Sequence, residues 1–118
     1  MRLSVMVLGD PVDSSALRVA ARMLEVAGNS GATLDTLFLY HKGAYAALNR
    51  CADPPLMARL QRLCAENGLV CVVCRTALAR FGFGRDPLSA PFRLGGLVDW
   101  LSACERSDRV LRLGSTHA

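Results

Sequence analysis

The 118-residue sequence lacks any long uninterrupted apolar run. A helix that crosses a bilayer needs roughly 20 consecutive apolar residues, and no segment here approaches that length, so we expect no membrane span. The first apolar run, residues 1–8, is followed at once by Gly9 and Asp10, which makes it too short for a secretory signal peptide. These absences predict a cytoplasmic protein.

Motifs for nucleotides and metals are also missing. The sequence has neither the G-x-G-x-x-G nor the G-x-x-x-x-G-K-[ST] spacing of phosphate-binding loops. The pair Cys71-Val-Val-Cys74 could supply half of a zinc site, but no second closely spaced Cys or His pair accompanies it. We therefore expect no metal and no organic cofactor.

Lysine is scarce, since Lys42 is the only one, and the formal charge of +4 comes from scattered arginines. A scattered excess is more typical of a solvated face than of a nucleic-acid groove. We expect no direct binding to nucleic acid, and a basic surface suited to an acidic protein partner.

The remaining composition describes an ordinary domain with a large apolar content. Hydrophobic residues make up 52% of the chain, which indicates that part of the apolar surface is covered by other subunits. Five cysteines, an odd number, in a chain without an export signal are expected to be free thiols. Residues 1–118 are expected to form a single domain.

Apolar runs alternate with helical spacings along the whole chain. Strands are expected at residues 3–8, 33–40, 69–74 and 109–113. Helices are expected from Asp13 or Ser14 to 28–31, over 43–49, 56–67 and 96–107, and directly after the strand at 69–74. A loop is expected at 81–91 and a frayed tail at 114–118. This alternation predicts an α/β fold, a three-layer α/β/α domain with a mainly parallel sheet of about four to five strands.

The strand at 69–74 ends abruptly in a helical turn, and Cys74 lies at the junction. In an α/β sheet, ligands and reacting groups collect at the carboxyl ends of the strands. The first N–H groups of a following helix favour the thiolate form of a cysteine, and Arg75 and Arg80 would add to that field. His41 follows the second strand, so it is expected at the same edge. We interpret Cys74 as a reactive thiol.

The cysteines also allow other interpretations. Cys74 could be a small buried hydrophobe, as unpaired cysteines often are. Cys71 and Cys74 could be a redox pair, but residues three apart on a strand point to opposite faces. Cys51, Cys64 and Cys104 are interpreted as packing or incidental residues.

Four stretches together resemble the DsrE/TusD family of sulfur-relay proteins. They are residues 37–45 (LFLYHKGAY), similar to F-F-Y-x-x-G-V-Y; 72–74 with 77–82 (VVC and ALARFG), similar to V-x-C-x-A-A-A-x-R-R-G; 92–97 (FRLGGL), similar to F-x-[IL]-S-G-L; and 107–111 (SDRVL), similar to x-D-R-[VL]-V. Their order and similar spacing cover the chain from the second strand onward.

The resemblance implies a sulfurtransferase in which Cys74 receives sulfur as a persulfide and passes it on. It implies partners as well: a small sulfur carrier as donor, and DsrF/TusC-like and DsrH/TusB-like subunits in a trimer or hexamer, with homo-oligomers as an alternative. The pathway would be tRNA 2-thiouridine synthesis or cytoplasmic sulfur oxidation. Arg80, Arg75, His41 and Tyr45 are candidates to support the anionic sulfur.

Several features depart from the family pattern: Arg75 occupies a usually small apolar position, the loop at 83–91 is shorter, and the turn after the first strand matches poorly. Phe81 stands where the second Arg of R-R-G is found, and Gly95 replaces the Ser before Gly-Leu. The alternative functions are a non-catalytic, partner-binding subunit of such a complex and, more weakly, a Cys71/Cys74 thiol redox protein.

Overall fold

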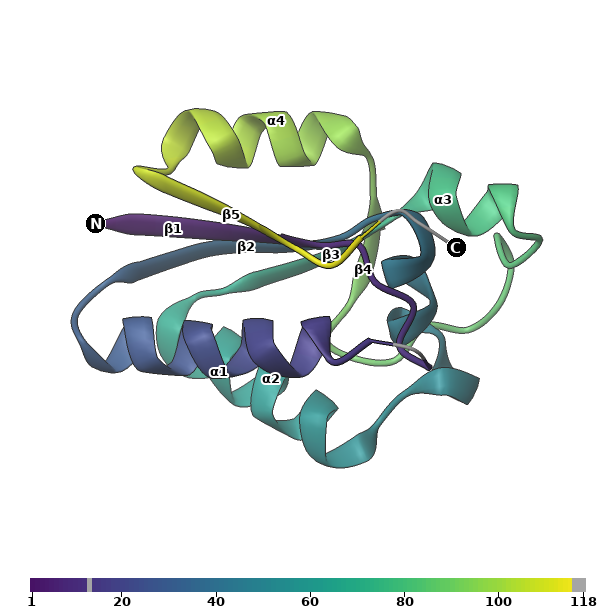
Figure 1. The fold of residues 1–118 in the computed structure, drawn as a ribbon, viewed down its shortest axis with the longest axis horizontal. Coiled ribbons are helices and arrows are strands. Elements are labelled where there is room, and N and C mark those ends of the chain that lie inside the picture. The colour runs from purple at the N-terminus through teal and green to yellow at the C-terminus, as the bar shows by residue number, and fades with distance from the viewer. Residues whose placement is uncertain (13, 116–118) are drawn as a thin grey trace.

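The computed structural model describes residues 1–12 and 14–115 (Figure 1). Its strands are β1 (Arg2–Val7), β2 (Thr33–Leu39), β3 (Val70–Cys74), β4 (Arg93–Gly95) and β5 (Arg109–Leu113). Its helices are α1 (Ala16–Asn29), α2 (Pro54–Asn67), α3 (Arg75–Arg80) and α4 (Leu97–Arg106), with 3₁₀ segments at η1 (His41–Ala47) and η2 (Asn49–Cys51).

The five strands form one sheet in the order β4-β3-β2-β1-β5, and every neighbouring pair is parallel. Helices α1 and α2 cover one face of the sheet and α4 covers the other, while α3 lies beyond the carboxyl end of β3 (Figure 1). The predicted three-layer α/β/α class is confirmed.

Burial explains why the central strands read as continuous apolar runs. Strand β2 is buried from its second residue to its last, and β3 is buried from Cys71 to Cys74. Strands covered on both faces carry apolar side chains at consecutive positions. The apolar face of α1 contains two alanines, Ala20 and Ala21, that are fully buried, and such small side chains let a helix approach the sheet closely.

Local signals set the ends of α2. The carboxylate of Asp53 accepts a hydrogen bond from the Leu56 N–H at 3.4 Å, and Pro54 and Pro55 fill the first turn, where a missing N–H costs nothing. Gly68 ends the helix in the left-handed conformation with φ of 72°. The helix was predicted over 56–67, so its start at Pro54 lies two residues earlier than expected. The prediction counted both prolines as part of the preceding loop.

Other boundaries also differ from the expected ones. Helix α1 begins at Ala16 after Ser15, and the Ser14 hydroxyl accepts a hydrogen bond from the Ala16 N–H at 3.1 Å; Asp13 lies outside the described residues. Residues 41–51 form two 3₁₀ segments instead of one helix. Strand β4 was not expected at all. Of the predicted tail, residues 116–118 lie outside the described part of the chain.

Helix α4 is fixed to the sheet by an aromatic stack and a buried carboxylate. The rings of Phe38 and Trp100 stack with centroids 5.8 Å apart. The Asp35 carboxylate is 7% exposed and accepts two hydrogen bonds from Arg106 at 2.9 and 3.0 Å and one from Arg2 at 3.0 Å. These bonds hold the pKa of Asp35 at about 2, with the Arg106 hydrogen bond as the largest cause.

The opposite side of α4 is apolar and exposed. Leu97, Val98 and Leu101 are 45%, 75% and 61% exposed and lie within four residues of one another on the helix.

Among the described residues, no helix is both long and apolar enough to cross a bilayer.

Candidate functional site

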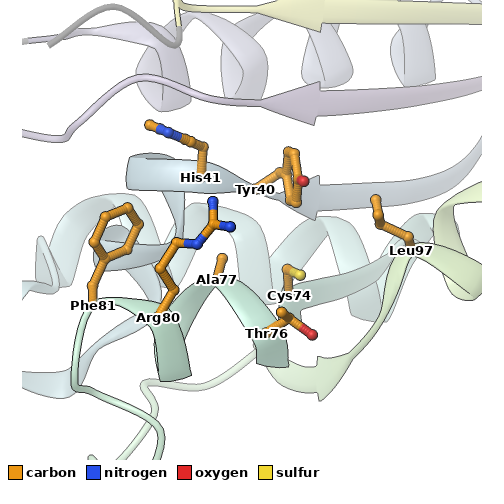
Figure 2. A pocket seen from close by; sticks show the side chains of 8 residues that line it. All are labelled: Tyr40, His41, Cys74, Thr76, Ala77, Arg80, Phe81 and Leu97. Atoms are coloured by element: carbon orange, nitrogen blue, oxygen red, sulfur yellow. The ribbon is translucent and has the colours of Figure 1, made fainter.

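A cavity of about 170 Å³ lies beside the carboxyl ends of β2 and β3 (Figure 2). Its lining comes from the end of β2, the end of β3, helix α3 and the first residue of α4: Tyr40, His41, Cys74, Thr76, Ala77, Arg80, Phe81 and Leu97. Neighbouring parallel strands that end at one edge bring these segments together, as is usual for ligand sites in α/β sheets. The site is therefore built by sheet topology.

Cys74 is the last residue of β3 and the N-cap of α3, and its side chain makes no capping hydrogen bond there. The residue is only 1% exposed, yet it contributes to the cavity wall. Figure 2 shows the Cys74 side chain on the side of β3 that faces Tyr40, the residue after β2. The thiol thus faces an internal space and is shielded from bulk water.

Arg80 ends α3 and supplies a positive charge to the same cavity. Its guanidinium points to the same side as the Cys74 sulfur, toward the end of β2 (Figure 2). Within residues 1–12 and 14–115, six ion pairs occur and none involves Arg80. This cation is consequently available to an anion that enters the cavity.

His41 occupies an unusual backbone conformation at the start of η1. Its φ is 52°, a left-handed value that costs energy for residues other than glycine. The Nδ1 atom is buried without a hydrogen-bond partner in the described part of the chain. The turn thus keeps a polar nitrogen inside the protein without a hydrogen-bond partner among the described residues.

Gly43 fixes the position of this turn against the end of β1. Its N–H donates hydrogen bonds to the carbonyls of Leu8 and Tyr40, each at 3.0 Å. A Cβ at this position would lie 2.4 Å from the carbonyl oxygen of Val7. Only glycine lets the backbone approach so closely, and the approach sets where His41 stands.

The structure brings together three of the five predicted site residues. Cys74, Arg80 and His41 line the cavity, whereas Arg75 is exposed outside it. Tyr45 does not line the cavity either: it packs edge-to-face on Phe81, with ring centroids 5.3 Å apart. Phe81, which replaces the family's second Arg, forms a cavity wall and also contacts the His41 ring edge-to-face at 5.6 Å.

The sequence did not predict five of the cavity residues, namely Tyr40, Thr76, Ala77, Phe81 and Leu97. Thr76 could have been found, because Thr76 and Arg80 are four apart and share one face of a helix. Tyr40 directly precedes His41 at the end of β2. Leu97 had no such signal, because it reaches the cavity only through the packing of α4 on the sheet.

The other cysteines are placed differently. Cys71 is buried on the side of α2, where its sulfur lies 3.7 Å from that of Cys64. All five cysteines are free thiols, and Cys51 is exposed. In the described residues, no group of three or more His, Cys, Asp or Glu side chains is arranged to hold a metal ion.

Comparison with known proteins agrees with this geometry. The profile of the DsrE/DsrF-like family matches residues 1–113. The crystal structure of the YchN protein from E. coli superposes with a TM-score of 0.75 and 26% sequence identity, over 95% of this chain and 99% of that chain. No curated protein matches the sequence. A match over almost the whole length supports a role related to sulfur relay, and the chain belongs to the DsrE/DsrF-like family.

Proposed function

We propose that this protein is a sulfurtransferase that carries sulfur as a persulfide on Cys74. The single observation that carries the proposal is the placement of the Cys74 thiol and the Arg80 guanidinium on one small cavity at the carboxyl edge of the sheet. Family membership supports the same class of chemistry. A persulfide anion and its donor are negatively charged, so an arginine with no ion-pair partner among the described residues suits them.

The transfer has two steps. The Cys74 thiolate attacks the outer sulfur of a donor persulfide, so that a new S–S bond forms and the donor leaves as a thiolate. An acceptor thiolate then attacks the outer sulfur of the Cys74 persulfide, and Cys74 returns to its thiolate form. No net oxidation occurs, and neither a metal nor an organic cofactor is needed.

Arg80 and His41 have separate roles in this proposal. The Arg80 guanidinium stabilises the negative charge on the terminal sulfur while the persulfide is held. His41 supports one end of the cavity through its edge-to-face contact with Phe81. Tyr45 acts indirectly, because its contact with Phe81 fixes the cavity wall.

Sulfur has to reach a buried thiol, and the surface around the cavity offers a docking place. Leu97 lines the cavity and belongs to the exposed apolar face of α4 together with Val98 and Leu101. A partner that covers this face would lie directly beside the site. We propose that the protein works in the cytoplasm, as a single domain within a homo- or hetero-oligomer, with a small sulfur carrier as donor.

Mass spectrometry tests the proposal. The protein is incubated with a cysteine desulfurase, cysteine and a small sulfur carrier, and peptides are then mapped. We expect one added sulfur atom on the peptide that contains Cys74, and its removal by a reductant. The Cys74→Ser variant should fold normally and take up no sulfur at this position. Cys104→Ser is the matched control and should load like the unaltered protein. Full loading of Cys74→Ser would refute the assignment.

One observation favours a second function, namely a partner-binding subunit without catalysis. Cys74 is only 1% exposed, which is the burial expected for a structural thiol. In this case Cys74 of the native protein would resist iodoacetamide as strongly as the buried Cys71 does, and no sulfur would be loaded. Alkylation of Cys74 well before Cys71 would exclude it.

A further inference from the structure

Outside the cavity, two thiols lie in direct contact at the junction of α2 and β3. Cys64 belongs to the last turn of α2 and Cys71 is the second residue of β3, and their sulfur atoms are 3.7 Å apart. Gly68, with φ of 72°, turns the chain between them. A disulfide has a sulfur–sulfur distance of about 2.05 Å, so a small side-chain movement is enough to form the bond.

The two thiols are not equivalent. Cys64 is partly exposed, whereas Cys71 is 2% exposed. The Cys64 and Cys71 sulfur atoms share a hydrogen bond, and this contact lowers the pKa of Cys64. The same contact, together with burial, raises the pKa of Cys71 strongly. Cys64 is therefore the thiol that an oxidant in solution can reach in its reactive form.

We propose that Cys64 and Cys71 form a redox site, separate from Cys74, which a peroxide converts to a reversible disulfide. In the first step the Cys64 thiolate attacks one oxygen of hydrogen peroxide, the O–O bond breaks, hydroxide leaves, and Cys64 becomes a sulfenic acid. In the second step the Cys71 sulfur attacks the Cys64 sulfur. The S–S bond forms, and the hydroxyl leaves as water with the proton from Cys71.

The two steps balance as a two-electron oxidation. Two thiols lose two electrons and two protons, and one peroxide becomes two water molecules. Conversion of Cys64 to the sulfenic acid also removes the negative charge that opposed ionisation of Cys71, so Cys71 becomes a better nucleophile at the moment when it is needed. A dithiol reductant reverses the reaction by thiol–disulfide exchange.

The site is independent of the sulfur-transfer cavity. Cys71 contacts Cys64 of α2, whereas Cys74 lines the cavity between α3 and the start of α4. Residues three apart on a strand point to opposite faces, so the sheet separates the two thiols. Failure of sulfur loading on Cys74 would leave this proposal unaffected, and the reverse also holds.

Peptide mapping after peroxide treatment tests the pair. A digest with trypsin and a glutamate-specific protease separates Cys64, on residues 63–66, from Cys71 and Cys74, on residues 67–75. The native protein is treated with hydrogen peroxide, unfolded and alkylated with iodoacetamide. We expect the two fragments to stay linked, two hydrogens lighter than their sum, and the alkylatable thiols to fall from five to three. Dithiothreitol should restore all five.

Variants decide which thiols are joined. Cys74→Ser removes the only thiol besides Cys71 on residues 67–75. A link that persists in this variant must therefore be made by Cys71, and we expect it to persist. Cys71→Ser should lose the link and let dimedone trap the sulfenic acid on Cys64. Loss of the link in Cys74→Ser, or separate fragments from the unaltered protein after oxidation, would overturn the proposal. Circular dichroism of each variant before oxidation identifies any that fail to fold.

Discussion

The ring of Phe38 in β2 stacks on the indole of Trp100 in α4, with centroids 5.8 Å apart and an angle of 25° between the planes. This contact joins the helical layer to the centre of the sheet. Leu97 lies one helical turn before Trp100 and forms part of the cavity wall. Together with the bonds between Arg106 and Asp35, the stack holds α4 on the sheet, and it helps to set the position of that wall.

Truncation of Trp100 should be costly. Trp100 is 9% exposed, and removal of a large buried aromatic side chain destabilises a protein by about 3–5 kcal/mol. We expect Trp100→Ala to lower the free energy of unfolding by this amount and Trp100→Phe by clearly less, in urea titrations followed by circular dichroism. Equal midpoints for Trp100→Ala and the unaltered protein would show that the stack contributes nothing.

Acid should weaken the link between α4 and the sheet through Asp35. Its pKa falls from an ordinary value of 3.8 in the unfolded chain to about 2 in the fold. A depressed pKa stabilises the fold fully above pH 3.8, and this contribution disappears as the pH falls through 2. The difference corresponds to about 2 kcal/mol.

The measurement is the unfolding free energy between pH 6 and pH 2 for the protein and for Asp35→Asn. The unaltered protein should lose stability over the lower part of this range, and the variant should be less stable at pH 6 but less sensitive to acid. Parallel curves for the two proteins would contradict the assignment.

Gly43 should tolerate no side chain. The Cβ of an alanine would lie 2.4 Å from the Val7 carbonyl oxygen, and a backbone atom cannot move aside without distorting the end of β1. Overpacking of this kind costs about 1–3 kcal/mol. Gly96→Ala is the control, because a Cβ there meets nothing within 4 Å. Thermal unfolding should show a much larger loss for Gly43→Ala than for Gly96→Ala.

Arg80 should matter for anionic reagents at Cys74 and less for neutral ones. Loss of about 1.4 kcal/mol of charge stabilisation slows a reaction tenfold, so Arg80→Ala should slow sulfur loading by about that factor. Alkylation by iodoacetate should slow more than alkylation by iodoacetamide. Arg75→Ala is the matched control, since Arg75 is exposed and does not line the cavity. Equal effects of the two variants would refute a specific role for Arg80.

The fold could be predicted because its strands are buried on both faces and so appear as apolar runs. Strand β4 escaped detection for the opposite reason. Arg93-Leu94-Gly95 has no apolar pattern, and it is a strand only because it pairs with residues 72–74 of β3. Pairing with β3, and not the local sequence of residues 93–95, makes this segment a strand.

The candidate site could be predicted only as far as chain order reveals it. Cys74 and His41 each follow a strand, so their shared edge was foreseeable. Arg75 follows Cys74 in sequence but does not line the cavity with it. Successive residues of a helix point about 100° apart, so neighbours in sequence face different directions. The contact between Cys64 and Cys71 depends on how tightly Gly68 reverses the chain, and composition and spacing do not specify that.

The sheet order has a consequence for how the chain is made. Strand β1 lies between β2 and β5, and its pairing with β5 joins Leu3 to Arg109. On the ribosome, β1 emerges before β2 and β5 and keeps one backbone edge unpaired until β5 has been synthesised. Pairing between segments so far apart in sequence slows folding, and it leaves an unpaired strand edge exposed in the nascent chain. Closure of the sheet therefore has to wait for residues 109–113, and a chain truncated before residue 109 would be prone to aggregate.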